Sequence, residues 1–228
     1  MSSAAGGWER PGDEMTGIVR KMLMGASGLL LIGFLAVHLS GNFLVFAGRD
    51  TFNHYSDTLV SNPLIYVAEL GLLVLFALHF ALGLVVTRGN WAARPTRYAV
   101  KRRAGGASHK SVASTTMILS GLFLLAFVPL HLWTFKFGPH YASPTDPAVR
   151  DIHRLVIEEF HRPVEVAWYV GAMIVIGFHL WHAFGSGLAS LGVRDRPVLR
   201  RVGQVLAVAI TVGFIAIPLA IFFWMPPA

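Results

Sequence analysis

Long apolar segments alternate with short polar ones along the whole chain. Crossing a hydrocarbon core of about 30 Å takes roughly 20 largely apolar helical residues, and five stretches meet that requirement. They cover residues 22–46, 64–86, 112–135, 164–188 and 202–224. The pattern predicts an all-α integral membrane protein, a five-helix bundle that forms a single membrane domain over residues 21–228.

The polar segments between the spans differ in character. Residues 1–20 lack the apolar run of a signal peptide, so we expect a loose polar tail there. In the segment SPTDPAVRDIHRLVIEEFHRP, Asp146 is suited to cap a helix and Pro147 to occupy its first position. Apolar residues then follow at helical spacing, which predicts a short amphipathic helix on the outer surface. Residues 88–111 are basic and suit either an anionic lipid surface or a cytoplasmic partner protein.

Charge and composition narrow the class further. The chain is 54% hydrophobic and only 14% charged, and of its 19 Lys and Arg residues fourteen fall on one side of the predicted spans. The positive-inside rule places that side, with the N-terminus, in the cytoplasm and the C-terminus outside. These cations lie in short connections between spans, which argues against nucleic-acid binding. The absence of cysteine excludes disulfides, cysteine-ligated iron–sulfur clusters and covalent c-type haem.

Each of the first four spans contains one deep histidine: His38, His79, His131 and His179. At 1.5 Å per residue, His38 and His131 lie about 25 and 28 Å from the cytoplasmic ends of their helices. His79 and His179 lie only about 12 and 13 Å deep on the same scale. Intramembrane histidines serve ion paths, proton relays or cofactors, although any single one can simply hydrogen-bond a neighbouring helix. Four histidines at two matching depths favour a cofactor.

Two neutral imidazoles from facing helices are what a six-coordinate b-type haem needs. We therefore expect two haems, an outer one held by His38 with His131 and an inner one held by His79 with His179. A structural zinc site would need four ligands at one level, and each level offers two. His182 lies some 4 to 5 Å closer to the cytoplasm than His179, which leaves it to contact a haem propionate or a backbone carbonyl.

Several glycines lie near these histidines. They would allow a flat porphyrin to approach the helix backbones, and ordinary close helix packing explains them equally well. The glycines concerned are Gly33, Gly41, Gly83 and Gly121.

Four motifs carry a resemblance to a known family: FLAVHLSGNF, ALHFALG, PLHLWTFKFG and FHLWHAFGSGLASLG. Over essentially the whole chain after Met15, the sequence resembles the di-haem, five-helix cytochrome b subunit of succinate dehydrogenase and fumarate reductase. The resemblance implies the same two ligand pairs, with the histidine that follows Phe178 as the fourth-helix ligand. It also implies a flavoprotein subunit that oxidises succinate, an iron–sulfur subunit, and a place in the cell (inner) membrane, where this chain anchors both and reduces quinone, usually menaquinone.

Quinone reduction requires two protons, so a protonatable group is expected beside the quinone. Glu69 is the first candidate, because it is the only carboxylate clearly inside a span, and Glu165 is the second. Alternatively, the quinone lies near the inner haem, among basic residues that equally suit haem propionates or lipid phosphates. These residues are Arg20, Lys21, Arg88 and His109.

Three other functions fit the same pattern. One is the haem b membrane subunit of a hydrogenase or a formate dehydrogenase, from which haem reduction by succinate would distinguish this protein. Another is a haem-free transporter or proton channel that uses the histidines as a relay, and such a protein would be colourless. The last is a bare anchor whose histidines only pack helices.

Overall fold

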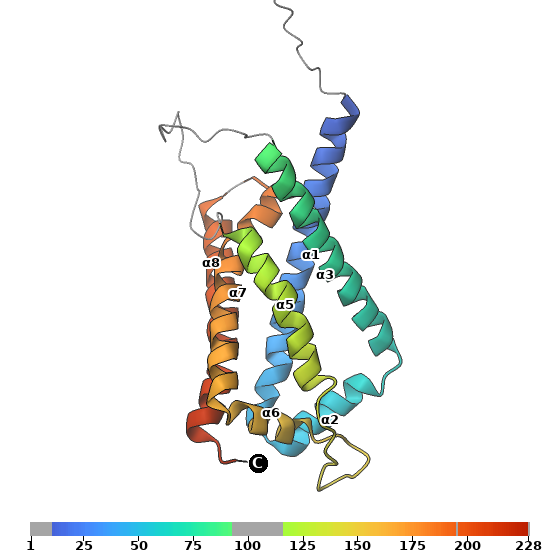
Figure 1. Ribbon diagram of the computed structural model, residues 1–228, viewed down its shortest axis with the longest axis vertical. Helices are drawn as coiled ribbons and strands as arrows, with labels where there is room; N and C mark the ends of the chain where they lie inside the picture. The colour runs from blue at the N-terminus through green and yellow to red at the C-terminus, as the bar shows by residue number, and fades with distance from the viewer. Residues whose placement is uncertain (1–10, 93–115, 195, 228) are drawn as a thin grey trace, which may run out of the picture.

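The computed structural model describes residues 11–92, 116–194 and 196–227, and over these residues it is all-α, without a β-strand (Figure 1). In chain order the elements are α1 (Pro11–Asn42), the 3-10 helix η1 (Phe43–Ala47), α2 (Arg49–Val60), α3 (Leu64–Ala92), α5 (Met117–Phe135), α6 (Ile152–Phe160), α7 (Pro163–Ser190) and α8 (Pro197–Trp224).

Five of these helices are long and apolar enough to cross a membrane: α1, α3, α5, α7 and α8. The prediction of an all-α, five-helix, multi-pass membrane protein is therefore confirmed. Many large apolar side chains point outward from the bundle, among them Leu73 and Val74 on α3. Apolar side chains on the outside of a membrane bundle contact the hydrocarbon of the lipid and not water, so exposing them costs no free energy.

Helix α7 lies at the centre of the packing, between α1 and α8. Its buried face includes Ala172, Met173 and Ile176, which join Ile217 and Ile221 of α8 in the core. Glycine lets α1 approach α7 closely, since a Cβ at Gly25 would lie 2.8 Å from the Gly187 carbonyl oxygen. Contacts between small residues of this kind are the usual basis of helix association in lipid, where no hydrophobic driving force acts between helices.

The short helices α2 and α6 lie across one end of the bundle, which we call the capped end (Figure 1). Asn53 of α2 joins them: its Nδ2 donates to Asp151 Oδ1 at 2.8 Å, and its Oδ1 accepts from the His153 backbone N–H at 2.9 Å. All three residues are buried, and Arg49 Nε lies 3.6 Å from Asp151 Oδ2. Burial and the nearby Arg49 cation lower the pKa of His153, so this histidine is a neutral packing group.

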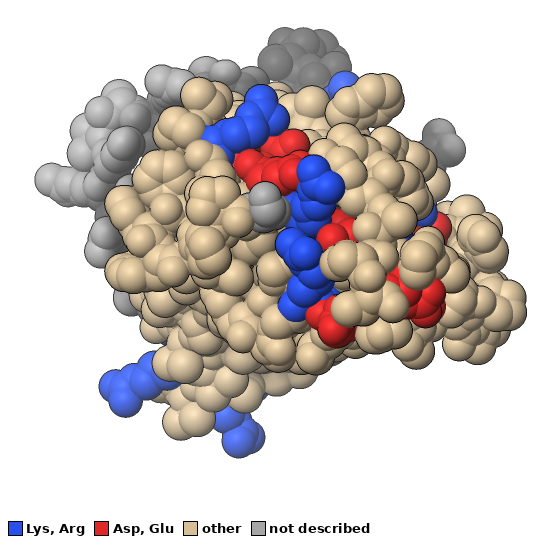
Figure 2. All heavy atoms as spheres, turned by 90° about the horizontal axis from the view of Figure 1, so that it is seen from below, with Lys and Arg blue, Asp and Glu red and all other residues tan. Residues whose placement is uncertain are grey.

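Figure 2 looks onto the capped end and shows basic and acidic side chains interleaved in a band. At this end of the bundle, Arg154 pairs with Glu158 at 2.7 Å and Arg162 with Glu159 at 3.0 Å. The charges are therefore largely compensated here. The opposite end carries Arg20, Lys21, Arg88 and the arginines of the α7–α8 connection, and we call it the basic end.

The boundaries differ from prediction in three places. The amphipathic helix of the capped end exists, but Asp151 caps it by accepting from Arg154 N at 3.1 Å, so its expected start at Asp146 and Pro147 is wrong. Asp146 instead closes a turn, with Oδ1 accepting from Ala148 N at 3.1 Å. Helix α1 begins at Pro11, so half of the expected loose tail is helical, while residues 1–10 lie outside the described chain. Neither α2 nor η1 was predicted.

Candidate functional site

One pair of intramembrane histidines lies toward the capped end. His38 of α1 and His131 of α5 have ring centroids 5.9 Å apart and ring planes at 89°. Each is four residues, or about one turn, before the end of its helix. Tyr169 OH lies 3.4 Å from His131 Nδ1, and Asn42 Nδ2 lies 3.4 Å from both ring nitrogens of His38.

Aromatic rings enclose this pair. Phe34 stacks on His38 at 5.3 Å and Phe127 stacks on His131 at 5.8 Å between ring centroids. Phe135 contacts His131 from the next turn of α5. These contacts surround the two imidazoles with apolar side chains from the same helices.

The second pair lies nearer the basic end of the bundle. His79 of α3 and His179 of α7 have ring centroids 6.4 Å apart and planes at 72°. Ser27 Oγ lies 3.2 Å from His79 Nδ1, and Ser120 Oγ lies 2.9 Å from His179 Nδ1. The two serines come from α1 and α5, so four helices meet at this site.

The spacing of both pairs fits one metal held between two imidazoles. A metal–imidazole nitrogen bond is about 2 Å long, and the ring centroid lies about 1 Å behind the nitrogen, so two axial ligands place their centroids about 6 Å apart. The observed separations are 5.9 and 6.4 Å. At His79, His131 and His179 the Nδ1 atom already has a polar neighbour, which leaves Nε2 as the natural ligand atom.

The donor set favours a group that brings its own equatorial ligands. Across the described ranges, no three His, Asp or Glu side chains gather in a way that would hold a bare metal ion. Two histidines at each level match the two axial positions of haem iron and fall short of the four ligands of structural zinc. The residues present therefore fit haem.

The glycines singled out from the sequence have different surroundings. A Cβ added at Gly33 or Gly83 would meet no heavy atom within 4 Å, so protein does not fill the space beside them. A Cβ at Gly121 would lie 4.0 Å from His179 Cε1. At Gly41 a Cβ would come within 2.5 Å of the Tyr55 hydroxyl, so this glycine serves helix packing at the capped end. A porphyrin contact at Gly41 is therefore the wrong interpretation.

The depth of each residue in its span predicted that His179, and not His182, pairs with His79. The positions of the rings agree with this prediction. The ring of His179 faces His79, whereas His182, one turn further along α7, is half-buried and makes no hydrogen bond to any described residue. Of the histidines near the ends, His161 bonds the Ile157 and Met225 carbonyl oxygens and is structural. His109 lies outside the described residues.

Glu69 has a partner that the sequence did not reveal. Its carboxylate forms an ion pair with Lys136, the residue that follows α5. The two side chains are 38% and 42% exposed, so the pair contributes at most about 1 kcal/mol to stability. Glu165, by contrast, lies 3.8 Å from Arg162, its neighbour one turn earlier in the chain. The structure thus distinguishes Glu69 by a link between two membrane helices.

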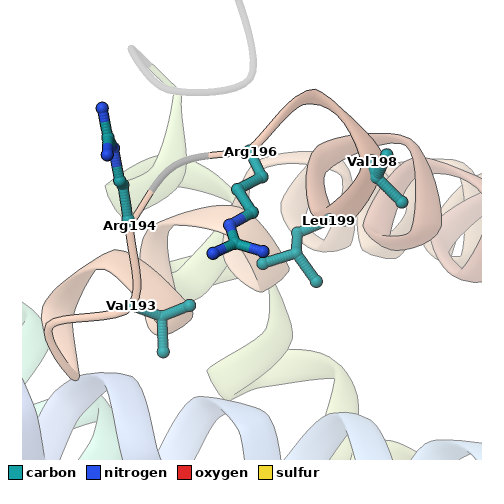
Figure 3. Close-up of a pocket in the computed structure, with 5 residues that line it drawn as sticks. All are labelled: Val193, Arg194, Arg196, Val198 and Leu199. Atoms are coloured by element: carbon teal, nitrogen blue, oxygen red, sulfur yellow. The ribbon is translucent and has the colours of Figure 1, made fainter.

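Arg20, Lys21 and Arg88 are exposed at the basic end and are not drawn into either histidine pair. Nearby, the α7–α8 connection forms a pocket of about 410 Å³ that the sequence did not predict, lined by Val193, Arg194, Arg196, Val198 and Leu199. In Figure 3 the Arg196 side chain reaches between Val193 and Leu199, whereas Arg194 points away. A guanidinium in an apolar recess suits a carboxylate or phosphate group.

Gly28 sets the position of the His79 ring. A Cβ at this residue would lie 2.9 Å from His79 Cε1 and 3.3 Å from Nδ1, so alanine would displace the ring from the backbone of α1. If haem occupies this pair, we expect Gly28→Ala to lose it, measured as haem per purified chain. Gly17→Ala is the control on the same helix, since a Cβ there meets nothing within 4 Å. Full haem content in Gly28→Ala would contradict the requirement for this close contact.

Comparison with models of protein families, with curated proteins and with solved structures found no match.

Proposed function

We propose that this chain is the di-haem cytochrome b subunit that anchors a succinate dehydrogenase or fumarate reductase to the membrane. The observation that carries the proposal is the presence of two histidine pairs at two levels of one bundle, each with the ring spacing that would let both imidazoles hold one haem. When bound, two b-type haems would supply one-electron carriers between an iron–sulfur subunit and membrane quinone. Succinate itself would react on the flavoprotein subunit, so this chain is the quinone-reactive part of the enzyme.

The chain's own residues position and insulate the two sites. Imidazoles from α1 and α5 face each other at one level, and imidazoles from α3 and α7 at the other. Hydrogen bonds at Nδ1 orient the rings, and aromatic side chains pack around His131. A pre-arranged pair of ligands would limit the reorganisation that electron transfer through a bound haem requires.

The two ends of the bundle have separate tasks in this proposal. The basic end faces the cytoplasm, following the positive-inside rule, and receives the flavoprotein and iron–sulfur subunits or the phosphates of the cell (inner) membrane. Arg20, Lys21, Arg88 and His182 are available there for haem propionates or lipid headgroups. The charge-compensated capped end, with α2 and α6, faces outside.

Quinone, which the resemblance to the family implies is menaquinone, takes up two electrons and two protons to become quinol. We place this step toward the capped end, where the Glu69 carboxylate, paired with Lys136, can take up protons from the outer aqueous phase and pass them one at a time to the quinone oxygens. A carboxyl group at this depth can regain its proton from the outer aqueous phase, because its side chain is 38% exposed.

Glu69→Gln tests this role. We expect quinone reduction by succinate to fall about 100-fold or more, the usual cost of losing a general acid, while both haems remain bound. Glu158→Gln is the control at the same end, since Glu158 pairs with Arg154 within α6, outside the membrane spans. Quinone reductase activity and haem content are measured on the same membranes. Unchanged activity in Glu69→Gln would move the quinone to the inner level.

The proposal as a whole is tested by isolating the chain with its co-purifying subunits and adding succinate before dithionite. We expect succinate to produce a reduced b-type spectrum and the co-purifying proteins to include a flavoprotein. A chain whose haem responds to hydrogen or formate but not to succinate belongs to another respiratory enzyme, and this result would overturn the succinate assignment.

A further inference from the structure

We infer that Ser27 and Ser120 are positioning residues that fix the tautomer of His79 and His179 and thereby tune the reduction potential of the inner site. Both hydroxyls are buried, with residue exposures of 2% and 7%, and each comes from a helix that supplies no ligand to this pair. The inference about the potential rests on the proposed function, whereas the inference about the tautomer does not.

Ser120 contacts both its own backbone and His179. Its Oγ lies 3.0 Å from Met117 O and 3.2 Å from Thr116 O, two oxygens that can only accept, and 2.9 Å from His179 Nδ1. A hydroxyl has one hydrogen, and we assign it to the carbonyl oxygens of α5, which makes Oγ the acceptor toward His179. In this assignment His179 Nδ1 carries the proton and donates it, which leaves the lone pair on Nε2.

His79 reaches the same tautomer through two acceptors. Ser27 Oγ donates to Met24 O at 3.0 Å, so it too presents a lone pair to its histidine. His79 Nδ1 lies 3.2 Å from Ser27 Oγ and 3.2 Å from Met24 O, and a carbonyl oxygen can only accept. The Nδ1–H of His79 is shared between these two oxygens, and Nε2 is again free.

The outer pair lacks this arrangement. Tyr169 OH lies 3.4 Å from His131 Nδ1, a longer contact in which either group can be the donor. His38 has Asn42 Nδ2 at 3.4 Å from both ring nitrogens, so neither nitrogen is selected. A serine hydroxyl therefore selects the tautomer only at the inner histidine pair.

The chemical consequence follows from ligand basicity. An imidazole that donates Nδ1–H to an oxygen is a stronger electron donor at Nε2, and a stronger donor stabilises ferric over ferrous iron. Removing the acceptor raises the reduction potential. The effect should be larger for Ser120→Ala, because His179 then loses its serine acceptor, than for Ser27→Ala, where Met24 O still accepts from His79.

The experiment is a spectroelectrochemical titration of the full complex. We expect Ser120→Ala to raise the inner haem's potential by about 59 mV, equivalent to a tenfold change in the ratio of the two oxidation states, with the outer haem unchanged. Ser27→Ala should shift it less, and Ser120→Thr, which keeps a hydroxyl, should restore the wild-type value. Ser40→Ala is the matched control, since Ser40 also bonds its own helix, at Ala36 O, but contacts neither pair.

Equal potentials in wild type, Ser120→Ala and Ser27→Ala, with two haems bound, would overturn the tuning while leaving the proposed function intact. Should Ser120→Ala not retain haem, the Ser27→Ala and Ser120→Thr potentials decide. ¹⁵N NMR of the histidine side chains in the full chain tests the tautomer whether or not haem is present. Protonated Nδ1 at His79 and His179 is expected, and protonated Nε2 would overturn the assignment even in a chain without haem.

Discussion

On the proposed function, His179→Ala is expected to bind one b-type haem per chain, against two expected for the wild type. The ring of His179 faces His79 across 6.4 Å, and no other histidine ring is placed opposite His79 among the described residues. The outer pair comes from α1 and α5 and shares no residue with the inner one, so its haem should stay. Haem extracted per purified chain measures the loss, and the remaining spectrum should be that of a single b-type centre.

His182→Ala is the matched control for this substitution. The two histidines lie one turn apart on α7, both half-buried, yet only His179 faces His79 and bonds Ser120. We therefore expect His182→Ala to keep both haems. Equal haem loss in the two variants would show that α7 is turned differently from the arrangement described, and would overturn His179 as the inner ligand.

His131→Ala should separate the two halves of the electron path. We expect the outer haem to be lost, the inner haem to remain reducible by succinate, and quinone reduction to fall by at least about 100-fold, because electron supply to the capped end is interrupted. Succinate-reduced spectra and quinone reductase rates on the same preparation measure both effects.

His140→Ala controls for general damage at the capped end, because His140 is exposed in the loop after α5. It should retain both haems and full activity. If His131→Ala lost its outer haem yet still reduced quinone at the wild-type rate, the quinone would have to react at the inner level, near the basic end. Glu69 would then lose its proposed role as the proton donor.

The membrane made much of this fold predictable. Lipid requires continuous apolar helices, so the five spans could be found from the pattern of the sequence, and the fixed rise per residue placed the histidines at two levels. The pairing of His38 with His131 and of His79 with His179 follows from depth alone, and the rings do face each other in these pairs. His179 could be separated from His182 for the same reason.

Contacts between distant segments were not predictable in this way. Helix α2, RDTFNHYSDTLV, is polar enough to suggest a loop, and it is held by Asn53 bonding Asp151, 98 residues away. That same bond explains why Asp151 caps α6, although the local pattern favoured Asp146. The pairing of Glu69 with Lys136 depends on how α3 lies beside α5. Of the two serines that contact the inner pair, only Ser120 could have been predicted from the sequence. At 1.5 Å per residue it lies about 12 Å into its span, level with the inner histidines.

The most direct test of the central claim is the number of haems bound to the wild-type chain, measured by haem extraction and by the reduced-minus-oxidised visible spectrum. Two b-type haems per chain are predicted, one for each histidine pair. A colourless chain would contradict the prediction, and His38, His79, His131 and His179 would then serve as a proton relay or as helix-packing residues.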